Sequence, residues 1–368
     1  MPTEAELWAL LTEVDGLPRG SAQVSALERV IRHADARGLV GLGVRARLRA
    51  VTAYLVTSQA NQALAAFLWC LHAHDEHPEE LAHEVRVLMR AFTTAVTVPR
   101  EFPGVPLPAL REVSAEMERR YREVGYGPRE VYETRFQDAL HLGDVAEART
   151  WFTRWRSEPL DEVSDCWECE TTDEVDHLVG LGDHEDAAGL GDLLLARGID
   201  CPAAPKRLLE SLIAAYLELG RFDDAAMAHL RSYPQILDAL SMIPVEHVSF
   251  CALTGNEGRG LEIVQRFLHT LDAPPAPGIA MGDAAAVAQL LRRVVARGGS
   301  RVTLHRRAWR DRPAGPVTAE DLLAETTDTA RAIAAAFDAR NGSTAVSGRV
   351  ERILDREPCT DGLRLTGG

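Results

Sequence analysis

The sequence of 368 residues predicts an all-α fold, a right-handed superhelical solenoid of degenerate helical hairpins closed by a C-terminal helical cap. Three observations lead to this prediction. Apolar side chains recur at helical spacing through most of the chain, a turn residue is repeatedly followed five positions later by a small residue, and the alternation typical of strands is nearly absent. Such hairpins bury a continuous core only by stacking on their neighbours, and the stack leaves a concave groove.

The hairpin pattern is clearest in residues 208–234. Leu209 and Tyr216 lie on the apolar face of a first helix. Gly220 is expected to end that helix, because glycine adopts the left-handed conformation without strain. Ala225 then begins a second helix, and its small side chain lets the two helices approach closely. The stretch therefore predicts one complete helical hairpin.

The same pattern occurs at four other places: Ser58 with Ala63, Gly143 with Ala148, Gly182 with Ala187, and Gly255 with Gly260. From Gly143 onward the consecutive turn glycines are 39, 38 and 35 residues apart. This regularity favours a true repeat over coincidental spacing in a generic helical bundle. The long interval before Gly143 is expected to hold one more helical pair, at 81–97 and 107–124, joined by a proline-rich loop.

The last hundred residues follow a different pattern. A helix is expected at 284–297 after a proline-rich break, and 297–317 is interpreted as a loop. Thr318, with an aspartate three positions later, is typical of a helix N-cap. We therefore expect a helix at 319–341, ended by a glycine, and one more short helix at 347–357.

These patterns divide the chain into three segments. Residues 1–272 form a helical-repeat array, 273–317 a proline/arginine-rich helix-and-loop connection, and 318–368 a C-terminal helical cap and tail. The run from Arg292 to Arg312 contains eight arginines and one acid. It is expected to be a solvated loop or a partner for acidic residues elsewhere in the chain.

Several segments resemble an uncharacterised family of tetratricopeptide-repeat-like proteins of actinobacteria and related bacteria. They are "MERRYREVGYGPREVYETRFQDALHLGD", "WFTRWRSEPLDEVSDCWECE", "FCALTGNEGRGLEI" and "AAAFDARNGS", and together they run from about residue 116 to residue 343. The resemblance implies an all-helical repeat fold with no established reaction. In that family a C-x-x-C pair is commonly followed by a third cysteine and then a histidine. Cys201 matches the third cysteine, whereas Lys206 stands where the histidine is expected.

The sharpest chemical feature is the C-x-x-C pair Cys166 and Cys169. Redox catalysis is disfavoured, because residues 161–176 contain eight acids and no lysine or arginine, a field that opposes thiolate formation. A structural zinc site at Cys166, Cys169 and Cys201 is the favoured chemical reading, since this spacing can place two sulfurs on one ion. An equal alternative is that these thiols pack as small apolar side chains at a junction between repeats.

The fourth zinc ligand is left open. His177 and His184 lie in the intervening hairpin and are candidates, as are Asp165 and a water molecule.

Composition excludes several classes of function. A net charge of −15 argues against nucleic-acid binding and against attraction to an anionic membrane. Six irregularly spaced cysteines do not form a secreted disulfide framework and the first residues do not resemble a secretory signal, so a cytoplasmic location is expected. The uncharged run 50–71 has nearly the length of a membrane span, but polar residues interrupt it and two helices around a turn are expected.

Catalytic motifs are also missing from the sequence. It has 39 arginines and one lysine, Lys206, and it has no phosphate-binding loop, nucleophile elbow or H-E-x-x-H pattern. We therefore expect a non-enzymatic scaffold or adaptor that binds a protein or peptide partner in its concave groove. The alternatives are a regulatory protein that responds to a ligand or peptide, and a zinc-dependent enzyme that uses zinc-bound water. The sequence leaves the oligomeric state open.

Overall fold

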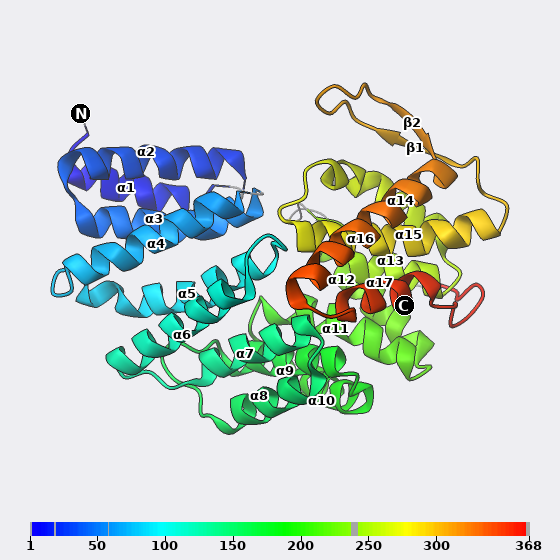
Figure 1. The fold of residues 1–368 in the computed structure, drawn as a ribbon, viewed down its shortest axis with the longest axis horizontal. Coiled ribbons are helices and arrows are strands. Elements are labelled where there is room, and N and C mark those ends of the chain that lie inside the picture. Colours follow the sequence, from blue (N-terminus) through cyan, green and yellow to red (C-terminus); the bar gives the residue numbers. More distant parts are fainter. Residues whose placement is uncertain (1, 18–19, 58, 237–241, 366–368) are drawn as a thin grey trace. The chain divides into compact units, whose positions relative to one another are not determined.

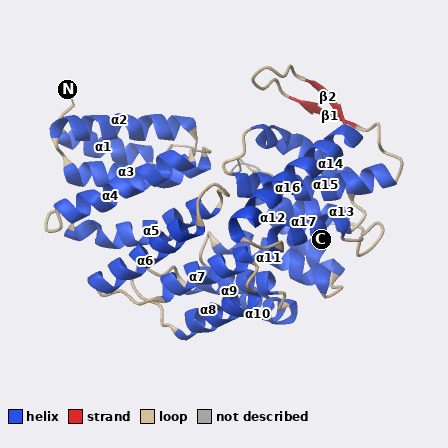
Figure 2. Cartoon of the chain, viewed as in Figure 1, coloured by secondary structure: helices blue, strands red, loops and turns tan. Residues whose placement is uncertain are grey.

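The computed structural model describes residues 2–17, 20–57, 59–236 and 242–365. Within them the fold is predominantly α-helical, with seventeen α-helices and one two-stranded sheet (Figures 1 and 2). The chain forms two compact units. Unit 1 contains Met1–Arg135 and Arg154–Ser164, and unit 2 contains Phe136–Thr153 and Asp165–Gly368. The division of the chain into three segments was inferred from the repeat pattern alone, and it stays a prediction.

Unit 1 consists of consecutive helices that pack on their neighbours in sequence. Its elements are α1 (Glu4–Val14), α2 (Ser21–Arg37), α3 (Val40–Val56), α4 (Ala60–Glu76), the 3-10 turn η1 (Ala82–Glu84), α5 (Val85–Arg100), α6 (Leu107–Val124) and the first part of α7 (Arg129–Leu142). Aromatic side chains join α4, α5 and α6 in its core. The rings of Phe67 and Phe92 meet edge to face at 4.9 Å, and the Tyr121 hydroxyl donates to the Met89 carbonyl at 2.9 Å.

The apolar run 50–71 forms the end of α3 and most of α4, so the expected pair of helices around a turn is confirmed. The helix expected at 107–124 is α6, with the same limits. The turn residue Ser58 lies outside the described residues. None of the described helices is both long and apolar enough to cross a membrane.

Unit 2 carries the glycine-turn hairpins. Its elements are the rest of α7, α8 (Val145–Ser157, whose end belongs to unit 1), α9 (Trp167–Leu181), α10 (His184–Arg197), α11 (Ala204–Glu218), α12 (Phe222–Ile236), α13 (Val245–Leu253), α14 (Glu257–Phe267), the 3-10 turn η2 (Leu268–Asp272), α15 (Pro277–Ala296), β1 (Thr303–Arg306), β2 (Gly315–Thr318), α16 (Ala319–Asn341) and α17 (Ala345–Asp355).

Each predicted turn glycine separates two helices, as expected. Gly143, Gly182, Gly220 and Gly255 have φ of 82°, 82°, 69° and 71°, the left-handed region in which a side chain is strained. The small residue five positions later is buried in each pair, and Ala148, Ala187 and Ala225 are 0% exposed. The first helices of successive pairs also contact each other, α9 with α11 and α11 with α13, and α13 in turn contacts α15.

The C-terminal helices confirm the capping signals. Thr318 caps α16 by accepting from the Asp321 N–H, and Gly342 ends the helix with φ of 66°. The short helix expected at 347–357 is α17. The helix expected at 284–297 is also present, but α15 begins earlier, at Pro277. Proline suits a first helical position because it has no N–H to leave unpaired there.

The interpretation of 297–317 as a loop was wrong, because part of it forms an antiparallel hairpin in which Thr303 pairs with Thr318 (Figure 2). Its strands are only four residues long, so a period of two was hard to see among the arginines. Tertiary contacts hold β1. Leu304 is buried, the Gln265 side chain bonds both backbone groups of His305, and Arg306 forms an ion pair with Glu325 at 2.7 Å.

Residues 359–363, the C-terminal strap, lie against the end of α13. The N–H groups of Cys359 and Thr360 donate to the Leu253 carbonyl, and those of Gly362 and Leu363 donate to the Thr254 carbonyl. These carbonyls are among the groups that a helix end leaves without a partner inside the helix. The strap therefore caps α13.

Candidate metal centre

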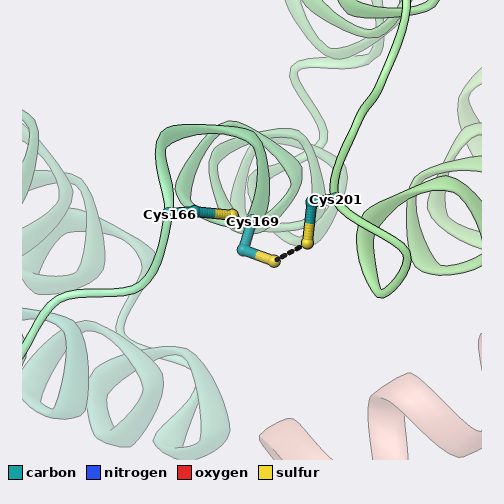
Figure 3. Close-up of side chains that lie close together, drawn as sticks. All are labelled: Cys166, Cys169 and Cys201. Carbon is teal, nitrogen blue, oxygen red and sulfur yellow. Dashed lines mark hydrogen bonds between the residues drawn. The ribbon is translucent and has the colours of Figure 1, made fainter.

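Three cysteines meet at the junction of α9 and α11. The sulfur atoms of Cys166, Cys169 and Cys201 all lie within 4.8 Å of one another, and Cys169 Sγ is 3.6 Å from Cys201 Sγ (Figure 3). In the described parts of the chain this is the one group of three or more metal-ligating side chains. All three are free thiols, and Cys169 is buried whereas Cys166 is exposed. The sequence prediction that Cys201 returns to the C-x-x-C pair is confirmed.

Local structure explains why the thiols converge. Cys166 is the N-cap residue of α9, and Cys169 lies one turn into that helix on the same side. Cys201 belongs to the short segment between α10 and α11, and α11 packs against α9. The two helices therefore bring the third thiol to the first two.

The surroundings favour a thiolate at one of the three positions. Hydrogen bonding from the Ala203 backbone N–H, with smaller contributions from the Cys166 and Cys169 side chains, lowers the pKa of Cys201. Burial raises the pKa of Cys169. A metal ion binds thiolates, so metal binding at this cluster releases protons and weakens as the pH falls. The neighbouring acids favour a dication over an anion.

Two carboxylates of the acidic stretch are buried rather than solvated. Glu168 and Glu170 are 7% and 8% exposed. Glu170 accepts from the Asp165 N–H at 3.0 Å. Glu168 accepts from the N–H groups of Asp200 and Cys201 through Oε1, and from the Cys166 thiol through Oε2. The sequence analysis considered these acids as a field around the thiols and Asp165 as a possible ligand, and it missed that Glu168 joins the two thiol-bearing segments.

Neither candidate histidine belongs to the thiol group. His177 is buried further along α9, with its ring centroid 4.4 Å from that of Phe136. His184 begins α10 on the far side of the Gly182 turn. Lys206, at the position where the family resemblance predicts a histidine, forms an ion pair with Glu210 at 3.5 Å. The role of His177 or His184 as the fourth ligand therefore stays a prediction.

The other cysteines lie apart from the cluster. Cys70 and Cys251 are 0% exposed, and burial raises the pKa of each to about 12. Cys359 belongs to the C-terminal strap. Because Cys70 and Cys251 are so buried and so weakly acidic, we interpret them as packing residues.

Unit 2 also contains a pocket of about 620 Å³. Its walls come from α11, α13, α15 and α17, and Ser249, Leu253 and Ile353 line it together with three arginines, Arg349, Arg352 and Arg356. No pattern in the sequence indicates this pocket, because helices far apart in the chain build it.

Ion pairs neutralise part of the charge in the pocket. Arg356 pairs with Glu218 at 2.8 Å and Asp355 pairs with Arg292 at 2.5 Å. Arg352 is exposed and has no ion-pair partner among the described residues. Gln289, also in the wall, is 3% exposed, and its buried Oε1 lacks a hydrogen-bond partner within the described chain. The pocket thus offers the Arg352 guanidinium and the Gln289 Oε1 acceptor to a ligand.

No protein-family model and no curated protein sequence matches the chain.

Proposed function

We propose that the chain is a non-catalytic scaffold of tetratricopeptide-like repeats, which binds a carboxylate-bearing peptide segment of another protein. The observation that carries this proposal is the pocket between α11, α13, α15 and α17. Leu253 and Ile353 offer it apolar contacts, Arg352 offers a charge-assisted hydrogen bond to a carboxylate, and Gln289 accepts from a peptide N–H.

The packing of unit 2 supports the repeat part of the proposal. Hairpins joined by left-handed glycines follow one another, and α9, α11 and α13 contact in sequence order. This nearest-neighbour stacking is the pattern expected of a solenoid, in which the first helices of the pairs line one surface. Two of the four pocket helices, α11 and α13, are consecutive members of this row, and a third, α15, contacts α13.

A structural zinc ion at Cys166, Cys169 and Cys201 is the second part of the proposal. The ion would join the N-terminus of α9 to the start of α11, and so fix two successive hairpins. Zinc commonly binds groups of cysteine thiolates and has no redox chemistry of its own, which suits a structural role here.

Peptide binding is tested with a displayed library of random peptides selected on the purified protein. We expect enrichment of peptides that carry a carboxylate next to apolar side chains. Arg352→Glu should lower their affinity at least tenfold, since it replaces an attraction with a repulsion. Arg301→Glu, which changes an exposed arginine outside the pocket, is the control with the same charge change. Enriched peptides that bind both variants like the wild type would contradict the assignment of the pocket.

The metal is tested by elemental analysis of protein purified without added zinc. We expect close to one zinc per chain in the wild type and a large loss in Cys201→Ser. Cys251→Ser is the control, because this cysteine is buried in α13 away from the cluster. Wild-type protein that binds no zinc, even after zinc is supplied, would show that the thiols only pack together.

A further inference from the structure

A buried carboxylate lies between the two segments that carry the thiols. Glu168 is 7% exposed, and its Oε1 accepts from the Asp200 N–H at 2.7 Å and from the Cys201 N–H at 3.3 Å. These two bonds hold Oε1. Oε2 takes part in neither of them and lies 3.7 Å from Cys166 Sγ, at the edge of the cluster.

We infer that Glu168 Oε2 is the fourth donor to a metal ion bound by Cys166, Cys169 and Cys201, which makes the centre a closed site of three sulfurs and one oxygen. The inference rests on the proposed zinc site. It departs from the sequence prediction, in which the fourth ligand is a histidine, Asp165 or water, and it names a residue inside the C-x-x-C motif itself.

Two of the donor–donor distances already fit a tetrahedral site. With zinc–sulfur bonds of about 2.3 Å and zinc–oxygen bonds of about 2.1 Å, neighbouring donor atoms are roughly 3.6 to 3.8 Å apart. The pair Cys169 and Cys201 is separated by 3.6 Å, and the pair Cys166 and Glu168 by 3.7 Å, and these two pairs are opposite edges of a tetrahedron. The three sulfurs lie within 4.8 Å of one another, so their edges shorten by about 1 Å at most when a metal binds. Glu168 lies outside the group in which all donor atoms are this close, so its Oε2 also moves toward at least one of Cys169 and Cys201 as the metal binds.

The position of the cluster on α9 also suits this set of donors. Cys166 is the N-cap residue of α9, and Glu168 and Cys169 belong to the first turn of the same helix. The N-terminus of a helix carries a partial positive charge, which offsets part of the negative charge that three thiolates and a carboxylate bring to one metal ion.

A fourth protein ligand decides between two of the possible functions. A zinc enzyme keeps one coordination position for water or substrate, whereas a structural site is closed by four protein donors. With Glu168 bound, no position remains for a reacting water. The centre then fixes the α9–α11 junction and performs no catalysis.

The test uses the cobalt(II)- and zinc-loaded full-length protein. Visible absorption of the cobalt form and X-ray absorption of the zinc form report the number of sulfur donors and reveal imidazole. We expect three sulfurs, one oxygen and no imidazole in the wild type. Glu168→Gln keeps an Oε1 acceptor for the Asp200 and Cys201 N–H groups but lacks the anionic Oε2. It should lower zinc affinity more than tenfold in a chelator competition and change the cobalt spectrum.

Glu170→Gln is the matched control, because Glu170 is equally buried in the same helix and also accepts a backbone N–H. It should leave zinc affinity and the cobalt spectrum unchanged. If Glu168→Gln does not fold, as judged by circular dichroism, Glu168→Asp serves instead, since the shorter acid withdraws Oε2 and should weaken zinc binding in the same direction.

The outcomes separate the two claims. Wild-type protein that binds no metal would refute the zinc site and the Glu168 inference together. A metal held by three sulfurs with unchanged affinity in Glu168→Gln would refute Glu168 alone. An imidazole signal that disappears in His177→Ala or His184→Ala would assign the fourth position to that histidine.

Discussion

At the scale of single residues, two histidines form a fully buried pair in unit 2. His229 in α12 and His247 in α13 are 0% exposed, and their Nδ1 atoms are 2.9 Å apart. His247 Nε2 lies 3.7 Å from Glu210 Oε1, whose carboxylate also pairs with Lys206. We assign the proton of His247 to Nε2, facing Glu210, so that His229 donates from Nδ1 to Nδ1 of His247. Both rings are then neutral.

The His229 ring contributes a loss of stability of unit 2 in acid. Burial, together with the nearby His247 and Arg259, lowers the pKa of His229 to about 3. The unfolded chain binds a proton at this residue below about pH 6.5 and the folded chain does not, so the free energy of unfolding falls as the pH drops from there toward about 3. Between pH 7.5 and pH 5.0 the loss from His229 should be about 2 kcal/mol, measured by urea unfolding.

The variant His229→Phe isolates this contribution. It should flatten the pH dependence over the same interval, whatever constant change in stability the substitution causes. His72→Phe, at a largely exposed position, should leave the pH dependence as in the wild type. An unchanged slope in His229→Phe would show that the ring is protonated in the folded protein. Burial also raises the pKa of Asp283 to about 7, which acts in the opposite direction and is common to all three proteins.

Single residues also show what sequence motifs can and cannot predict about the metal centre. The C-x-x-C spacing and the third cysteine could be predicted, because sulfur ligands have characteristic spacings. The role of Glu168 could not, since it depends on backbone N–H groups more than thirty residues away along the chain. Acids that look equivalent in the sequence differ in the structure by what they touch.

At the scale of elements, the packing of α14 predicts opposite effects for two glycines of the same helix. A Cβ at Gly260 would lie 2.6 Å from Leu290 Cδ1 and 3.0 Å from Cys251 Cβ, whereas a Cβ at Gly258 meets nothing within 4 Å. Gly260→Ala should therefore destabilise unit 2 by about 1 to 3 kcal/mol through overpacking. Gly258→Ala should be neutral or stabilising by up to about 1 kcal/mol through helix propensity.

Thermal and urea unfolding of both variants measure this difference. Equal effects of the two substitutions would mean that α14 does not pack on α15 as the structure shows. The prediction tests the requirement for a small residue five positions after the turn glycine, which is the basis of the repeat pattern.

Most elements could be predicted because their signals are local. Thr318 and Gly342 mark the ends of α16 through bonds to residues three or four positions away. The hairpin of β1 and β2 could not be predicted, because the Gln265 side chain and Glu325 hold it from other elements. The arginine-rich run illustrates both cases. We expected this run to be a solvated loop or to pair with acids of the same chain. The structure shows such pairs, Arg297 with Glu257 and Arg312 with Asp272, and the identity of these partners follows only from the fold.

At the scale of the whole molecule, the two compact units predict a local response to metal removal. With the proposed zinc ion loaded, its removal by a chelator should increase amide hydrogen exchange at the start of α9 and of α11, because the thiol cluster joins these segments of unit 2. Exchange in α2, α3 and α4 of unit 1 should not change. Hydrogen-exchange mass spectrometry before and after chelation makes the comparison on one sample.

Cys201→Ser is the control for this experiment. It should show high exchange at α9 and α11 from the beginning and no further response to the chelator. A change of similar size in both units, or none despite loss of the metal, would contradict a structural role confined to this junction.

The pocket marks the limit of prediction at this scale. Its walls combine α11 with α17, and no periodicity relates these helices. The sequence predicted a groove because solenoids have one, but not which side chains line it. The repeat pattern identifies the small residues that pack between helices, but it does not identify residues that line the pocket, such as Arg352.

The C-terminal strap has a consequence for the order in which the protein is made. The carbonyls of Leu253 and Thr254 receive their hydrogen bonds from residues 359–363. Helix α13 is synthesised well before the strap. During synthesis these two carbonyls therefore bond to water until nearly all of unit 2 has emerged from the ribosome. Gly255 then allows close contact of the two backbones, since a Cβ at this position would lie 2.2 Å from the Gly362 nitrogen. Residues of the strap thus complete the end of a helix that is synthesised about a hundred residues before them.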